Sequence, residues 1–356
     1  MVKNDQTIGH RVNSAVMASN SSTSKKMTLK DIAQAVNVSP FTVSVVLNGA
    51  RSNTRVSEAT RERILVAARE MGYLPNSLAR ALRKSSTNIL GLYFGYGHLE
   101  PHDPFHAEVL TGLQRGCEVC EKDLMIHYSF HRYGVDEIFA ELAGGKIDGL
   151  VLIASPNDPL VARLHGSNLS FVAMTDVIPG VPSVIADDHA GSVQIAEHLA
   201  ERGHRTVLYR TCPGESDSAR RRQAGFEEGA RRHGMTVIEG YTEDWKGGVS
   251  AQEAALLAHR HENGITAAVC WGDPSAYMLL SFAKQQGIRI PDDLAVVGFN
   301  GIDLPFEPAK TLTTVRANWA RVAQKAVQLL VHRLEGDTEI ADLTVLPVEF
   351  MPGETS

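Results

Sequence analysis

Residues 28–49 of the chain read TLKDIAQAVNVSPFTVSVVLNG, and they contain two short helical patterns that lie almost back to back. The first pattern runs over residues 29–35 and the second over residues 40–47, with a connection too short for an ordinary loop. Thr28 and Ser39 are placed to cap the two helices, and a proline in the first turn of the second helix costs no hydrogen bond. Apolar residues recur at helical spacing in both segments, which predicts one shared seam. The stretch therefore predicts a helix-turn-helix.

The start of the second predicted helix, around Phe41, is expected to face solvent. In a DNA-binding helix-turn-helix this part enters the major groove and contacts base edges, although an ordinary helical hairpin remains the alternative. A third helical pattern over residues 55–73 would close a small core. Residues 25–84 carry 11 Lys and Arg against 4 Asp and Glu, whereas residues 85–356 carry 22 against 36. A basic region at one end of an otherwise acidic chain favours phosphate binding there, and therefore DNA.

Three consecutive motifs resemble the N-terminus of the lac/gal repressor (LacI/GalR) family of bacterial transcription regulators. They are the stretch quoted above, then RVSEATRERI, then GYLPNSLARAL, and the resemblance covers nearly everything from Met27 onward. It implies a hinge helix that is too short to hold itself in water and forms only against DNA and its twin in a homodimer. It also implies that Leu82 inserts into a central minor-groove step, although these residues could instead be a plain linker.

The expected DNA contacts depart from the family pattern in two places. The family often has an arginine at the position of Val45, where it binds guanine, so base readout here depends on Pro40, Phe41 and apolar contact with thymine methyl groups. The loop over residues 49–56 is longer than the common form, and its arginines are expected to contact phosphates. The residues expected to contact double-stranded operator DNA are Thr28, Ser39, Pro40, Phe41, Thr42, Ser44, Val45, Asn48, Arg51, Arg55, Tyr73, Asn76, Leu82 and Arg83.

From residue 88 onward, apolar strand patterns alternate with helical ones, which indicates parallel sheets covered on both faces. The predicted fold class is an N-terminal all-α helix-turn-helix domain with a hinge helix, then a C-terminal α/β domain of two doubly wound parallel-sheet subdomains. The resemblance makes this second domain periplasmic-binding-protein-like, with three crossovers and a small-molecule effector, a sugar or sugar derivative, in the cleft. Four divisions are predicted: 1–26 as a disordered extension, 27–73 as the DNA-binding domain, 74–87 as hinge helix and linker, and 88–356 as the effector-binding and dimerisation domain. Translation could instead begin at Met27. Within the last domain, the predicted subdomains are roughly 88–186 plus 316–335, and 187–315 plus 336–356.

Ligands collect at the carboxyl ends of strands in such sheets, so the residues just after each predicted strand are the effector candidates. Asp176 could accept two hydroxyl hydrogen bonds or be a turn residue, and Phe105 could stack on a sugar face or belong to the core. Arg222, in the segment DSARRRQAGF, matches the family's ligand-binding arginine, whereas Arg221 is expected to be a solvated charge. The residues expected to bind the effector are Tyr96, Phe105, Asp176, Arg222, Trp271 and Asn300.

Two of these positions also differ from the family. Gly272-Asp273 stands where the family usually has Asn-Asp, and Asn300-Gly301 stands where it usually has Asp-Asp or Asp-Asn. A glycine removes a hydrogen-bonding side chain, and asparagine replaces a charge with an amide donor. The resemblance therefore implies where the cleft lies, whereas these differences leave the identity of its ligand open.

Other chemistry receives little support from the sequence. Cys117 and Cys120 form a Cys-x-x-Cys inside a helical pattern, without the second pair that a metal site needs, and are expected to be reduced thiols. Residues 187–189, Asp-Asp-His, could suggest acid–base catalysis, but on a strand-to-helix turn they are expected to cap and pair. No Gly-rich phosphate loop or metal-ligand spacing appears, so we expect no enzyme, no cofactor and no metal.

The expected function is therefore a sequence-specific, effector-controlled DNA-binding repressor, and the alternative is a solute-binding receptor with the same cleft and no gene-control role. No apolar run is long enough for a membrane span, and no cleavable leader is visible, so the expected location is cytoplasmic, on the nucleoid. A homodimer is expected rather than a tetramer, because no heptad extension follows the last strand pattern.

Overall fold

The computed structural model describes residues 27–48, 55–74, 81, 86–97, 99–100, 102–126, 134–212, 214, 216–244, 247–304 and 308–356. The chain forms two compact units, one up to Arg83 and one from Lys84 onward. Within the described residues, no helix has the length and apolar character needed to cross a bilayer.

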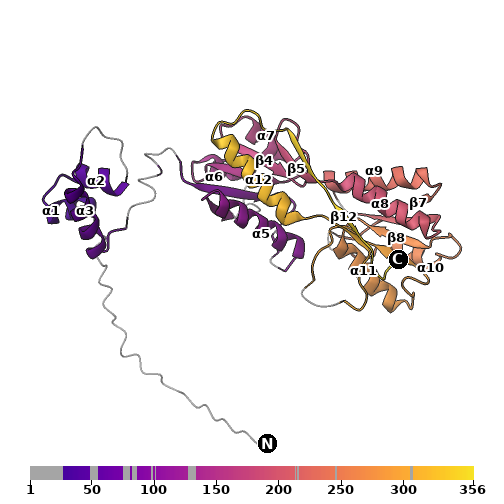
Figure 1. The fold of residues 1–356 in the computed structure, drawn as a ribbon. Coiled ribbons are helices and arrows are strands. Elements are labelled where there is room, and N and C mark those ends of the chain that lie inside the picture. The colour runs from indigo at the N-terminus through magenta and orange to yellow at the C-terminus, as the bar shows by residue number, and fades with distance from the viewer. Residues whose placement is uncertain are drawn as a thin grey trace, which may run out of the picture. The chain divides into compact units, whose positions relative to one another are not determined.

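The first unit packs three helices around a small apolar core (Figure 1). Ile32, Val43 and Ile64, one from each helix, are completely buried at its centre. The predicted apolar seam is therefore confirmed, and the third helix closes it. The helices are α1 (Leu29–Ala35), α2 (Pro40–Asn48) and α3 (Glu58–Glu70).

Local hydrogen bonds fix the turn between α1 and α2. The Thr28 side chain heads a capping box at the start of α1, and Ser39 Oγ accepts the N–H of Thr42 at 3.0 Å at the start of α2. Asn37, between the helices, has a φ of 52°, a left-handed conformation that asparagine tolerates better than most residues. The helix-turn-helix predicted from the sequence is confirmed, including its caps.

The second unit begins with a parallel sheet of six strands in the order β11-β5-β4-β3-β1-β2. Successive residues of β3 point to opposite faces: Leu150 and Leu152 pack with α6 and α7, whereas Val151 and Ile153 pack with α5 and α12. Because helices cover both faces, the inner strands β1 and β3 are continuous apolar runs, whereas the edge strands β2 and β11 are partly exposed. The elements of this first subdomain are β1 (Ile89–Phe94), α5 (Pro104–Val119), β2 (Asp123–Ile126), α6 (Val135–Ala143), β3 (Gly149–Ile153), α7 (Pro159–His165), β4 (Ser170–Met174), β5 (Ser183–Ala186), α12 (Trp319–Leu334) and β11 (Leu343–Leu346).

The second subdomain has a four-stranded parallel sheet in the order β7-β6-β8-β9. Leu208 of β6 packs in the cluster of α10 and α11, and its neighbours Val207 and Tyr209 pack in the cluster of α8 and α9. Figure 1 shows α8 and α9 side by side over this sheet. The elements are α8 (Asp188–Glu201), β6 (Thr206–Thr211), α9 (Asp217–Arg232), β7 (Thr236–Tyr241), α10 (Ala251–Ala258), β8 (Ala267–Cys270), α11 (Asp273–Gln285) and β9 (Ala295–Val297).

The chain passes between the two subdomains three times: between β5 and α8, after β10 (Thr314–Arg316) into α12, and from β11 into β12 (Glu349–Met351). β10 and β12 pair antiparallel, apart from the two larger sheets. Two parallel sheets with three connections confirm the predicted fold class.

One part of the predicted subdomain division is wrong. Residues 336–356 were assigned to the second subdomain, but β11 pairs in parallel with β5 at the edge of the first sheet. The physical reason is that α12 ends on the first subdomain, so the next strand reaches the nearest free edge there. Strand periodicity alone does not say which of two sheets a strand joins.

Several predictions fall on other parts of the chain. The disordered extension over residues 1–26, most of the hinge helix and most of the loop over residues 49–56 lie outside the described residues. The same is true of four expected DNA contacts, Arg51, Asn76, Leu82 and Arg83.

Candidate functional site

The first candidate site is the exposed start of α2. Pro40 and Phe41 open this helix, and the Phe41 side chain is 57% exposed although it is large and apolar. Its helix neighbours Val43 and Val46 are buried in the three-helix core, which fixes the direction in which Phe41 points. An exposed aromatic ring on a rigid helix start is suited to apolar contact in a DNA major groove.

The other expected DNA contacts in the described part of this unit vary in exposure. Thr28, Ser39 and Arg55 are exposed. Tyr73 packs partly against the three-helix core. The residues of α2 that are half-buried are Thr42, Ser44, Val45 and Asn48.

The second candidate site is a cavity of about 280 Å³ between the two subdomains of the second unit. Its walls come from the carboxyl ends of strands in both sheets, where parallel sheets usually hold ligands. Five of the six predicted effector residues line it, namely Tyr96, Phe105, Arg222, Trp271 and Asn300.

Aromatic rings dominate this cavity. Phe105 and Trp319 meet edge to face with their ring centroids 5.1 Å apart, and Phe94 and His106 do so at 4.8 Å. Phe94, His106 and Trp319 were not predicted as site residues. Trp319 opens α12 and is separated by two residues from β10, a three-residue strand too short to be predicted from its sequence pattern.

Two of the five N–H donors of Arg222 are bonded to the protein. Its side chain is 4% exposed, and its Nε donates to Asp188 Oδ1 at 2.8 Å. Its Nη1 donates to the carbonyl oxygen of Trp271 at 2.6 Å, and the guanidinium lies 4.0 Å from the centre of the Phe299 ring. No hydrogen bond of its Nη2 occurs within the described part of the chain, so both N–H groups of Nη2 are available to a ligand.

Asn300 also has one group occupied. Its Oδ1 accepts the indole N–H of Trp319 at 3.2 Å, and its φ of 125° is unusual for a residue with a side chain. The Trp319 bond holds the amide in place at the cavity wall. The Asn300 Nδ2 group is therefore oriented as a donor.

Asp176 is not among the residues lining the cavity. Its Oδ2 accepts the hydroxyl of Tyr96, and its Oδ1 accepts the N–H of Ser218 at 2.8 Å. Burial raises the pKa of the Asp176 carboxyl, and these hydrogen bonds offset the rise only in part. Burial and the nearby Asp176 charge raise the pKa of Tyr96, so its hydroxyl keeps its proton and donates. Asp176 positions Tyr96 at the cavity.

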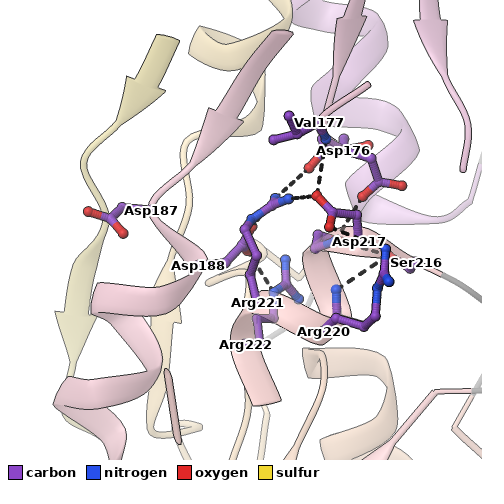
Figure 2. A network of polar contacts seen from close by, with 12 residues as sticks. Asp176, Val177, Asp187, Asp188, Ser216, Asp217, Arg220, Arg221 and Arg222 are labelled. Atoms are coloured by element: carbon purple, nitrogen blue, oxygen red, sulfur yellow. Dashed lines mark hydrogen bonds and ion pairs between the residues drawn. The ribbon is translucent and has the colours of Figure 1, made fainter. Parts of the chain in front are cut away.

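Residues 187–189 cap and pair, as the sequence predicts. Asp187 Oδ1 accepts the N–H of Ala190 at 3.1 Å, and Figure 2 shows its side chain apart from the arginines. Asp188 is completely buried and holds two arginines. His189 Nε2 lies 3.1 Å from Glu228.

The expectation that Arg221 is a solvated charge is wrong. Its side chain is 19% exposed, and it donates to Asp188 at 2.6 Å, to the carbonyl of Thr175 at 2.7 Å and to Asp217 (Figure 2). Two of these partners come from distant parts of the chain, which the helical pattern around Arg221 could not show.

The cysteine pair shows no metal or redox arrangement in the structure. Cys117 is buried in α5, Cys120 caps its end, and both are free thiols. Burial raises the pKa of Cys117 to about 11, which makes it unreactive at neutral pH. Across the described residues, no cluster of three or more His, Cys, Asp or Glu could hold a metal ion.

A helix-turn-helix with an exposed aromatic start and a two-subdomain clamp around an aromatic cavity define a class of protein: ligand-responsive DNA-binding regulators. Known proteins agree with this class. Residues 28–76 match the family described as "Bacterial regulatory proteins, lacI family", and residues 196–356 match the "Periplasmic binding protein-like domain". The chain therefore carries a lacI-type DNA-binding domain followed by a periplasmic-binding-protein-like domain.

Two relatives are named as transcriptional repressors, and the sequence match covers nearly the whole length of each. The chain is 27% identical over 316 residues to the HTH-type transcriptional repressor PurR of Photobacterium profundum, covering 86% of this chain and 92% of that protein. It is 28% identical over 319 residues to the HTH-type transcriptional repressor CytR of Escherichia coli, covering 87% and 90%. The fold also matches the lac repressor dimer bound to operator and the anti-inducer ONPF, with a TM-score of 0.77, 24% identity and coverage of 93% and 99%. This protein is thus a DNA-binding transcriptional regulator.

Proposed function

We propose that the protein is a homodimeric repressor whose affinity for operator DNA changes when a small-molecule effector occupies the cavity between the subdomains. We place it in the cytoplasm, on the nucleoid. The observation that carries the proposal is that both subdomains contribute to the cavity wall, the first through Tyr96 and Phe105 and the second through Arg222 and Trp271. A ligand that contacts both subdomains stabilises one relative orientation of them, and so shifts the population that binds DNA.

The proposed effector is a sugar derivative that carries an apolar or aromatic group. The family resemblance implies a sugar or sugar derivative, and the lining of the cavity favours the derivative. Both oxygens of Asp176 and of Asp188 already accept protein donors, and so does Asn300 Oδ1. A bare sugar would depend on Glu100 and Asp103, the two carboxylates that line the cavity, to accept from its hydroxyls, whereas an aromatic or apolar group is well matched to the rings of Phe94, Phe105 and Trp319.

The transcriptional regulator CelR shares this fold, with a TM-score of 0.67 and 24% identity, and its structure is a complex with cellobiose. That ligand belongs to CelR and supports only the general idea of a carbohydrate-type effector in this fold. The rival reading, a receptor with no gene-control role, would retain the cavity but would not bind DNA sequence-specifically.

The first experiment tests DNA binding. A binding site is selected from a pool of random double-stranded DNA with the full-length protein, and affinity is measured by fluorescence anisotropy at two salt concentrations. We expect a palindromic site whose affinity falls steeply with salt, because phosphate contacts release counterions. Failure to select any site would favour the receptor reading.

The second experiment tests the effector class. Thermal shift is measured with free sugars and with the same sugars carrying an aromatic substituent, because a ligand that binds only the native state raises the melting temperature. We expect larger shifts with the substituted compounds, and a loss of the shift in Phe105→Ala. Equal shifts for both series would contradict the aromatic part of the proposal while leaving the DNA-binding function intact.

A further inference from the structure

We propose that Asp217 and Arg221 form a latch that holds the two subdomains together beside the effector cavity, so that closure depends on the chain's own ion pair as well as on a ligand. Both residues lie in the first two turns of α9, in the second subdomain. Their partners are backbone groups of residues 175–177, which follow β4 of the first subdomain. The residues are positioning residues for the cavity and need not touch the effector.

Three hydrogen bonds cross between the subdomains at this point (Figure 2). Val177 N–H donates to Asp217 Oδ2 at 3.1 Å, and Arg221 Nη2 donates to the Thr175 carbonyl at 2.7 Å. Ser218 N–H donates to Asp176 Oδ1 at 2.8 Å. All three involve a charged group, and such bonds are stronger than neutral ones.

The ion pair makes two of these bonds, those to the backbone of Val177 and Thr175, depend on one another. Arg221 also donates to Asp217, so each residue fixes the side chain through which the other reaches the first subdomain. Asp188 anchors Arg221 from behind at 2.6 Å, which orients its guanidinium toward residues 175–177. Removing either Asp217 or Arg221 should therefore release most of the crossing bonds together.

The latch is adjacent to the cavity. Thr175 and Ser218, which carry two of the crossing bonds, both line the cavity wall. An effector that displaces or tightens this wall would act directly on the latch. This consequence for regulation rests on the proposed function, whereas the latch itself does not.

Arg220 offers a matched control within the same helix. It is a neighbouring arginine that also contacts Asp217, at 3.4 Å, but its side chain is 65% exposed and it makes no bond to the first subdomain in the described part of the chain. Replacing it removes the same charge from the same helix without touching the crossing bonds.

The test is hydrogen–deuterium exchange of the full-length protein, without added ligand, for wild type, Arg221→Leu, Asp217→Ala and Arg220→Leu. In the two latch variants we expect exchange at residues 175–181 and 216–222 to rise by about tenfold or more, since bonds to charged groups are being lost. Arg220→Leu should match the wild type. The strands β1 and β6 should keep their protection in every variant, which shows that the fold is intact.

Two further measurements separate a latch from a merely structural role. In the double variant Asp217→Ala/Arg221→Leu, exchange should rise no further than in the larger single variant, because one latch is lost only once. Raising salt from about 0.05 to 0.5 M should speed exchange at residues 175–181 in the wild type but not in the latch variants, since the pair is partly exposed and screened. Arg221→Lys, which keeps the charge but cannot span all three acceptors, should give an intermediate rate.

Unchanged exchange at residues 175–181 in both latch variants would overturn the proposal, and so would a uniform rise across the whole second unit. If Arg221→Leu does not fold, Asp217→Asn serves in its place, because it removes the charge and keeps the shape. Operator binding, measured separately, decides the proposed function, so a failed latch and a failed regulator give different results.

Discussion

Replacement of Asp188 by alanine is the most demanding test of how the cavity is built. The carboxylate is completely buried and holds two guanidinium groups, Arg222 at 2.8 Å and Arg221 at 2.6 Å. Without it, the partners of Arg222 within the described residues are the Trp271 carbonyl and the rings of Phe299 and Trp319, none of which carries a negative charge, at a site where the side chain is 4% exposed.

The size of the effect follows from this burial. Removing one partner of a buried ion pair leaves an uncompensated charge and costs about 3–5 kcal/mol. Arg221 adds little to this figure, because it retains Asp217 and is partly exposed. Domain stabilities are usually about 5–15 kcal/mol, so the second unit should lose a large part of its stability.

Urea unfolding followed by tryptophan fluorescence measures this loss, because all three tryptophans, at positions 245, 271 and 319, belong to the second unit. With a denaturant slope of about 2–3 kcal/mol per molar, the midpoint should fall by about 1–2.5 M. Asp187→Ala is the matched control, since it removes only a helix cap and should cost about 1 kcal/mol.

A second variant checks the reasoning itself. Adding Arg222→Met to Asp188→Ala removes the stranded charge, so the double variant should be more stable than Asp188→Ala alone. An Asp188→Ala midpoint within about 0.3 M of the wild type, or a double variant that is less stable still, would refute the view that Asp188 neutralises a buried arginine.

Three other changes test the rest of the structure. Phe41→Ala should leave stability within about 0.5 kcal/mol of the wild type, because the side chain is exposed, but should weaken binding to the selected operator, as anisotropy would show; unchanged affinity would remove Phe41 from the interface. Asp148→Ala should cost about 1–2 kcal/mol at pH 7, because the carboxylate accepts hydrogen bonds from Ser86, Thr87 and Asn88. Burial would raise the pKa of Asp148, but these hydrogen bonds lower it overall. The stabilisation by the Asp148 carboxylate is therefore present above the unfolded pKa of about 3.9 and is lost as pH falls through the folded pKa. A stability difference between wild type and variant that does not shrink at low pH would contradict this. Gly225→Ala should lower the melting temperature, because its Cβ would lie 2.3 Å from the carbonyl oxygen of His189 and force α8 and α9 apart, whereas an unchanged melting temperature would mean that the helices separate at no cost.

Local signals in the sequence were enough to predict the first unit. Thr28 and Ser39 cap their helices through neighbours three residues away, and the apolar spacing of α1 and α2 is repeated in their burial. The inner strands of the two large sheets were also predictable, since they are short apolar runs such as β3, whereas the short strands β10 and β12 were not predicted.

Long-range pairing explains what the sequence did not show. In the sequence, Arg221 is one of three consecutive arginines with nothing to distinguish it. Its hydrogen bond to the Thr175 carbonyl exists because the fold places residues 46 positions apart next to each other. Trp319 reaches the cavity because α12 returns to the first subdomain, and Asp176 bonds to Tyr96, 80 residues earlier, instead of lining the cavity. In each case the decisive partner is set by topology, which residue spacing does not encode.

The three chain connections between the subdomains restrict how this protein can move. All three are short: Asp187 alone lies between β5 and α8, and two residues lie in each of the others. One of the two residues between β11 and β12 is Pro347, which has a fixed backbone angle. Three such connections oppose sliding or separation of the two subdomains. They favour rotation of one subdomain against the other, about the line that joins the connections. Ligand binding in the cavity would therefore change the angle between the two subdomains. In a symmetric pair of chains, that angle could set the spacing between two DNA half-sites.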